Sequence, residues 1–150
     1  MKPLIVLLLL GHSVLAQVHS NAHAHNDYEH TRPLFDALLN GFGSVEADVY
    51  LVNGTLLVSH NTPGPKAKTL EQLYLRPLDS LIQANGGNVY SNFEGPFWLM
   101  IDCKTSTGTY EAIRAAVRKY PALMSKGDKG PVKIFLSGNR PLELMVKDGY

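Results

Sequence analysis

Hydrophobic and polar positions alternate along this chain with two different periods, and each period predicts one kind of element. Short apolar or alternating runs bounded by turn residues predict strands over 18–25, 44–60, 97–104 and 132–138, the second folded back at Asn53-Gly54. Apolar residues at helical spacing predict helices over 32–40, over 69–85 with a break near Pro77, over 109–120, and from 140 onward. Strands that alternate with helices are typical of an α/β fold with a parallel sheet.

These strand–helix units predict a partial (β/α)8 TIM barrel of about four units, because a whole barrel has eight such units in ~250 residues. We expect residues 17–150 to form the N-terminal part of that barrel. Half a barrel leaves open strand edges and an apolar face. Three explanations are open: the chain is a fragment, a truncated gene product, or a smaller open α/β domain.

Residues 1–16 differ from the rest of the chain. Lys2 is followed by an apolar run from Leu4 to Leu10 and by small and apolar residues up to Ala16. This layout predicts a secretory signal peptide cleaved after Ala16, because the apolar run is far shorter than the ~20 residues that span a bilayer. We therefore expect a secreted, periplasmic or otherwise extracytoplasmic protein.

Composition and charge add little about partners. The formal net charge is +1 with no basic run, so nothing indicates a nucleic-acid partner. Cys103 is the only cysteine, so no disulfide can form within the chain, and we expect it to be a buried small hydrophobe. Asn53-Gly54-Thr55 matches a glycosylation sequon, but the Asn-Gly hairpin turn is sufficient to explain this tripeptide.

Acidic side chains lie inside the predicted strand that begins at residue 44. Because successive side chains point to opposite faces of a strand, Glu46, Asp48 and Tyr50 share one face. In a barrel strand that face is buried, and two carboxylates there would repel each other and lose hydration unless a hard divalent cation lay between them. The alternative is an edge strand with both acids in water.

The strand over 97–104 carries a second charged pair, Asp102 and Lys104, on one face of an otherwise apolar run. A charge in such a strand needs a partner. One interpretation is a plain ion pair. The other is a third carboxylate for the same cation, with Lys104 facing an anionic substrate. His60, at the end of the return strand, is either an exposed side chain or part of the same site.

The segment "HAHNDYEH" at 23–30 puts three histidines and two acids into eight residues, which few folds need for stability. Three interpretations are open: a metal cradle, a catalytic centre or a hydrophilic tail. His25-Asn26 lies at the end of a predicted strand, as do the other polar pairs, and barrel enzymes place their sites at the carboxyl ends of strands. The sequence therefore predicts a site there and not a loose tail.

Together these residues resemble the barrel phosphodiesterases that include phosphatidylinositol-specific phospholipase C, the glycerophosphodiester phosphodiesterases and the spider-venom sphingomyelinase D enzymes. The resemblance rests on "HND" at 25–27, "GFGSVEADVYLVNGTLLVSH" at 41–60 and "IDCK" at 101–104. "HAHNDY" is similar to the "SHN-x-Y" stretch of the phospholipases C and closer still to a little-characterised bacterial and fungal branch. The resemblance runs from about residue 21 to the end, which is the first half of that fold.

The resemblance implies a secreted, metal-dependent phosphoric diester hydrolase for phospholipid or glycerophosphodiester-like substrates, in transient contact with a membrane surface. It implies His25 and His60 as the general acid–base pair and Lys104 as a contact to the phosphate. It implies a Ca²⁺ or Mg²⁺ site made by Glu46, Asp48, Asp102 and Asn26. The chain departs from the family at Asp102, where many relatives have Glu, and in lacking the later strands that supply part of the substrate pocket.

Two other functions stay open. His23-x-His25 near the end of a first strand also resembles the way amidohydrolase-type barrels hold zinc, although the remaining predicted ligands are hard oxygens that favour Ca²⁺ or Mg²⁺. Half a barrel could instead be a non-catalytic remnant or a binding protein. A phosphodiesterase needs both His25 and His60, a zinc hydrolase depends on His23, and a remnant turns nothing over.

Overall fold

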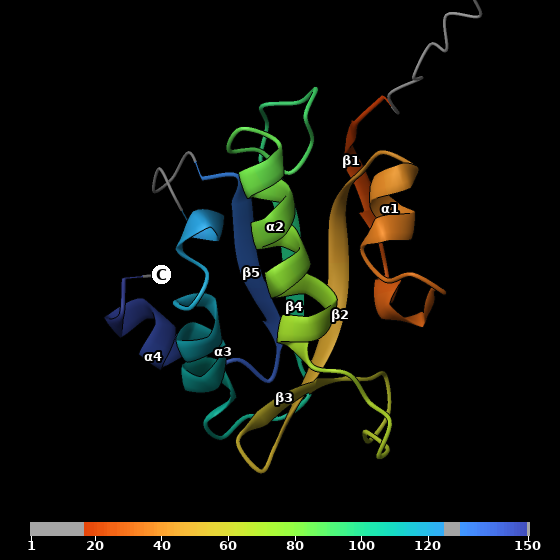
Figure 1. The fold of residues 1–150 in the computed structure, drawn as a ribbon. Coiled ribbons are helices and arrows are strands. Elements are labelled where there is room, and N and C mark those ends of the chain that lie inside the picture. Colours follow the sequence, from red (N-terminus) through yellow and green to blue (C-terminus); the bar gives the residue numbers. More distant parts are fainter. Residues whose placement is uncertain (1–16, 125–129, 150) are drawn as a thin grey trace, which may run out of the picture.

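Four parallel strands and one antiparallel strand form a single sheet, described here from a computed structural model for residues 17–124 and 130–149. The strands are β1 (His19–Ala24), β2 (Phe42–Val52), β3 (Thr55–Val58), β4 (Phe97–Cys103) and β5 (Val132–Gly138). The parallel strands lie in the order β1-β2-β4-β5, and β3 pairs antiparallel with β2. This curled sheet is half of a (β/α)8 barrel, as predicted (Figure 1). The predicted signal peptide lies outside the described residues.

The helices follow the parallel strands, and α1, α2 and α3 lie on the near side of the sheet in Figure 1. The α-helices are α1 (Phe35–Leu39), α2 (Arg76–Ala84), α3 (Thr109–Val117) and α4 (Leu142–Lys147). Short helical turns are η1 (Asp27–Glu29), η2 (Glu71–Leu75) and η3 (Pro121–Met124). Helix α1 is shorter than the predicted 32–40, because Leu34 has a φ of 66°, outside the helical region. Among the described residues, no helix is long and apolar enough to cross a membrane.

The helix is not interrupted near Pro77, so the predicted break is wrong. A turn of π-helix, η2, runs directly into α2, and the helix continues through Arg76. Pro77 lies in the first turn of α2. The missing N–H of proline therefore falls where the hydrogen-bond pattern changes from the π-helix to the α-helix, so the ring interrupts no regular α-helical hydrogen bond.

The helical face of the sheet forms the hydrophobic core. Fully buried side chains there come from the two central strands: Val45, Ala47, Val49, Leu99 and Ile101. Cys103 belongs to the same face and is 1% exposed, which confirms the expected buried hydrophobe. Burial raises the pKa of its thiol to about 11, so the thiol stays protonated and weakly reactive.

The opposite, inner face of the sheet carries the polar side chains. Strand register places Asp48 beside Asp102 and Asp102 beside Ser137. Nearer the amino ends of the strands, Trp98 and Phe135 are 40% and 39% exposed and pack edge to face. Because β2 lies between β1 and β4, the alternative of an edge strand with its acids in water is wrong.

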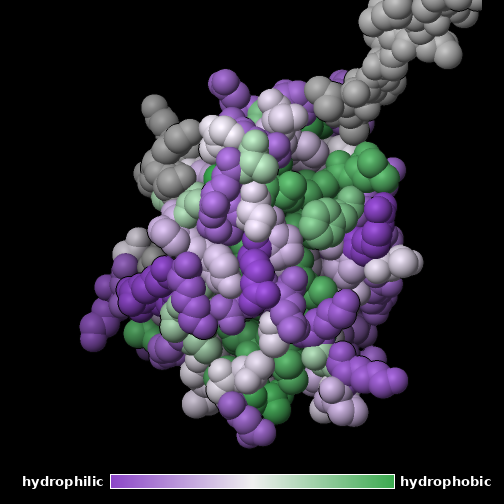
Figure 2. All heavy atoms as spheres, in the orientation of Figure 1, coloured by the Kyte–Doolittle hydropathy of each residue, from purple (hydrophilic) through white to green (hydrophobic). Residues whose placement is uncertain are grey.

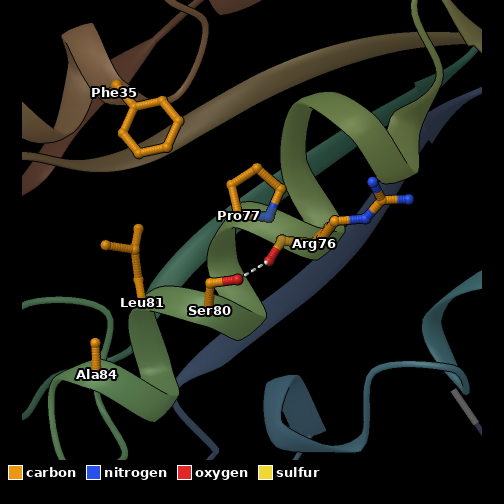
Figure 3. A pocket seen from close by; sticks show the side chains of 6 residues that line it. All are labelled: Phe35, Arg76, Pro77, Ser80, Leu81 and Ala84. Carbon is orange, nitrogen blue, oxygen red and sulfur yellow. Dashed lines mark hydrogen bonds between the residues drawn. The ribbon is translucent and has the colours of Figure 1, made fainter.

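An apolar groove lies on the helical side of the molecule, between α1 and α2 (Figures 2 and 3). Phe35 of α1 faces Pro77 and Leu81 of α2 across it, and Arg76 points away from Phe35 (Figure 3). Its remaining lining residues are Ser80 and Ala84. The groove therefore brings no acid–base pair together and lies across the sheet from the polar residues.

Candidate active site

All of the site residues that the sequence predicts lie in one connected polar network at the carboxyl ends of the strands. His25 and Asn26 follow β1, and both contact Glu46 of β2. His25 Nε2 lies 3.3 Å from Glu46 Oε2, and the backbone N–H of Asn26 donates to the same oxygen at 3.1 Å. Asn26 has a φ of 51°, a left-handed conformation that asparagine tolerates better than most residues, so the chain can turn sharply here.

The second half of the network is centred on Asp48. His60 Nδ1 lies 3.2 Å from Asp48 Oδ2. Lys104 Nζ lies 2.9 Å from Asp48 Oδ2 and 2.6 Å from Asp102 Oδ2, so the ammonium group bridges two neighbouring strands. The ion pair between Asp102 and Lys104, one of the two interpretations of the sequence, is present, and it includes Asp48 as well.

Tyr28 connects the two halves of the network, and the sequence does not predict a role for it. Its hydroxyl donates to Asn26 Oδ1 at 2.8 Å and lies 3.4 Å from His60 Nδ1. Burial and the nearby Asp48 carboxylate raise the pKa of the Tyr28 hydroxyl, so it remains protonated and able to donate. The stretch "HAHNDY" contained this signal, but the contact to His60 depends on the fold.

The acids on β2 are buried, whereas the two histidines are exposed. The side chains of Glu46 and Asp48 are 7% and 1% exposed, whereas those of His25 and His60 are 73% and 52% exposed. Each imidazole therefore has one ring nitrogen against a buried carboxylate while most of the ring faces solvent. A carboxylate at one nitrogen orients the ring and selects its tautomer, which leaves the other nitrogen for a ligand.

Neighbouring side chains favour the charged forms of Asp102 and Lys104. Burial favours the neutral carboxyl, but hydrogen bonds from Lys104 and from Ser137 outweigh it and hold the pKa of Asp102 below its usual range. Ser137 Oγ donates to Asp102 Oδ1 at 2.7 Å, a contact that only the β4–β5 register reveals. Burial likewise opposes the charge on Lys104, but Asp102 and Asp48 raise its pKa. The residue after Ser137 must be small, because a Cβ at Gly138 would lie 2.6 Å from Asp102 Oδ1.

The predicted Ca²⁺ or Mg²⁺ site was compared with the residues present. Within residues 17–124 and 130–149, no group of three or more His, Cys, Asp or Glu side chains is spaced to hold a metal ion. However, Asp48 Oδ1 is buried and has no hydrogen-bond partner in that part of the chain. An unpartnered buried carboxylate oxygen is costly, and oxygen donors are the ligands that these cations prefer, so Asp48 is the predicted ligand that a hard divalent cation would suit best.

A buried pair, Asp27 and Tyr74, anchors the turn that carries His25 and Asn26. Asp27 is 0% exposed, and its Oδ2 accepts from the Leu34 N–H at 2.6 Å and from the Tyr74 hydroxyl at 2.9 Å. Burial raises the pKa of Asp27, and these two donors only partly offset that effect. Tyr74 also reaches the backbone oxygen of Glu46 at 3.5 Å, so it ties η1 to β2. No short-range pattern indicates a contact between residues this far apart in the chain.

Replacing Tyr74 by phenylalanine should lower the free energy of unfolding by about 1–3 kcal/mol, because a buried carboxylate loses a hydrogen-bond donor while the ring volume stays. Urea unfolding compares the variant with the parent. Tyr120→Phe is the matched control, since the Tyr120 hydroxyl makes only a 3.4 Å contact to Glu71. An equal loss in both variants would show that the Asp27–Tyr74 pair has no special role.

Comparison with known proteins shows the family of this chain. The model of the AIM6-like phosphodiesterase domain matches residues 13–97, more than half of the chain. "Altered inheritance of mitochondria protein 6" of Kluyveromyces lactis is 34% identical over 166 residues, which cover 85% of this chain and 40% of that protein. The proteins of the same name from Lachancea thermotolerans and Saccharomyces cerevisiae S288c are 33% and 30% identical over 85% and 84% of this chain. No solved structure matches the chain.

The chain matches only part of the length of each relative. The chain spans 40%, 36% and 39% of the length of these three relatives, respectively. The residues that match the family model, 13–97, include both predicted histidines, His25 and His60, and two of the predicted acids, Glu46 and Asp48. On the family match and on the identity to these relatives, the chain belongs to the AIM6-like phosphodiesterase domain family.

Proposed function

We propose that the protein is a secreted phosphoric diester hydrolase that depends on a divalent cation and acts on phospholipid or glycerophosphodiester-like substrates. One observation carries this proposal. His25 and His60 both face solvent, and each has one ring nitrogen against a buried carboxylate of β2, Glu46 or Asp48. Paired, oriented imidazoles suit a reaction that removes one proton and donates another.

The two histidines divide the proton transfers between them. A phosphodiester is anionic and resists attack by an oxygen nucleophile. One imidazole accepts the proton of the attacking hydroxyl, and the other donates a proton to the leaving oxygen. Glu46 and Asp48 orient the two rings, because each carboxylate lies against one ring nitrogen and leaves the other nitrogen for the substrate.

Lys104 supplies a positive charge that can contact the phosphate. Lys104 keeps its proton, because Asp48 and Asp102 raise the pKa of its ammonium group. We assign it to a contact with the phosphate oxygens, where it neutralises negative charge that develops in the transition state. A Ca²⁺ or Mg²⁺ ion held by Glu46, Asp48, Asp102 and Asn26 would add Lewis-acid neutralisation of the same charge.

The test is hydrolysis of bis(p-nitrophenyl) phosphate and of a phospholipid panel by the purified protein, with Ca²⁺, Mg²⁺, Zn²⁺ or EDTA. The proposal expects turnover that requires Ca²⁺ or Mg²⁺ and is lost in EDTA. Turnover that requires Zn²⁺ and is lost in His23→Ala would instead support the zinc hydrolase. A folded protein without turnover on any substrate would contradict the proposal and support a non-catalytic relative.

A further inference from the structure

The tip of the β2–β3 hairpin contains an Asn-x-Ser/Thr sequence that has no part in the proposed hydrolase reaction. Asn53-Gly54-Thr55 is the only Asn-x-Ser/Thr sequence in the chain. The hairpin pairs Val52 with Thr55, so Asn53 and Gly54 are the two residues of the turn. Their φ angles are 49° and 76°, as a tight two-residue turn of this kind requires.

The tripeptide is exposed to solvent. Asn53, Gly54 and Thr55 are exposed, and the hairpin projects from the lower end of the molecule in Figure 1. A Cβ built on Gly54 would meet no atom within 4 Å. In the part of the chain that the structure describes, the side chains of Asn53 and Thr55 make no hydrogen bond. The Asn53 amide is therefore free to carry a bulky substituent without disturbing the core.

We propose that Asn53 is an N-glycosylation site. Transfer forms a bond between Asn53 Nδ2 and the anomeric carbon of an oligosaccharide. The bond from that carbon to the diphosphate of a lipid-linked donor breaks, the lipid diphosphate leaves, and the amide gives up one proton. The Thr55 hydroxyl completes the sequence that the host transferase reads.

The tip of the hairpin lies several residues beyond the site residues of β2. Asn53 follows Asp48 along β2, and a strand rises about 3.3 Å per residue, which places the tip on the order of 15 Å beyond that carboxylate. The proposal rests on the secretion that the proposed function includes, and not on the hydrolase activity, because it requires only that the chain meets the glycosylation machinery.

The experiment expresses the full chain in a yeast host that performs N-glycosylation. The product is digested with a peptide-N-glycosidase and followed by gel mobility and by the mass of the peptide that contains Asn53. We expect a shift on digestion and conversion of Asn53 to aspartate. Thr55→Ala should abolish both, and Thr55→Ser should retain both. These variants leave the Asn-Gly turn intact, whereas Asn53→Gln would strain the positive φ.

An unmodified chain from cells whose own glycoproteins are modified would overturn the proposal. This holds whether the chain fails to enter the secretory pathway or enters it and is skipped. A shift that survives Thr55→Ala would also overturn it, because the sugar would then lie elsewhere. Neither readout depends on turnover, so failure of the hydrolase proposal would leave this result unaffected.

Discussion

We expect His60→Ala to lower kcat/KM for a phosphodiester by about 10²- to 10⁴-fold, the range expected when a general acid or base is removed. His60 faces solvent and contacts Asp48 at only one ring nitrogen, so truncation removes little packing. The same loss is expected for His25→Ala, which removes the ring beside Glu46. Steady-state kinetics with Ca²⁺ or Mg²⁺ measure the effect, and thermal unfolding should show that both variants remain folded and still respond to the cation.

The control for these variants is His30→Ala. His30 lies in the same histidine-rich segment and is exposed, but its side chain makes no hydrogen bond to the site residues. Turnover of His30→Ala should stay within experimental error of the parent. Normal turnover in either His25→Ala or His60→Ala would show that the proton-transfer roles are assigned to the wrong side chains.

Asp48→Asn should remove both turnover and the response to divalent cations. The Asp48 side chain is 1% exposed and has a buried oxygen without a partner, so it is the donor that gains most from a bound cation. A ligand that binds only the folded state stabilises it by about 2.7 kcal/mol at 100 times its dissociation constant. Titration of Ca²⁺ or Mg²⁺ during thermal unfolding should raise the midpoint of the parent and leave that of Asp48→Asn unchanged.

Asp79→Asn makes the same chemical change away from the site. Asp79 lies on α2 and accepts a hydrogen bond from Gln83, on the helical side of the sheet. Its cation response and turnover should match those of the parent. If Asp48→Asn still gains stability with cation as the parent does, Asp48 does not hold the ion, and the ligand assignment fails.

Much of the site was predictable because strand geometry is local. A period of two places Glu46 and Asp48 on one face of a strand wherever that strand lies. The Asn53-Gly54 signal likewise determines a hairpin from two residues, and the structure confirms it through the pairing of Val52 with Thr55. Boundaries were less predictable: Leu34, with its positive φ, delays the start of α1.

The contacts that complete the site were not predictable from local pattern. Tyr28 reaches His60 across the network, Ser137 reaches Asp102 between strands, and Tyr74 reaches Asp27 through the core. Each pair is distant in sequence, and each depends on register or on helix placement. A single chain carries no periodic signal for such contacts, because many partners are compatible with the same amphipathic pattern.

The sequence by itself determined the α/β class, the hairpin and the set of polar residues at the strand ends, because these depend on side-chain alternation and turn chemistry within short segments. Only the tertiary structure decided that β2 lies between β1 and β4, so that Glu46 and Asp48 are buried while their histidine partners remain in solvent. It also decided that Lys104 bridges Asp48 and Asp102. Burial and cross-strand register are properties of the assembled sheet, and they set the charge balance of the site.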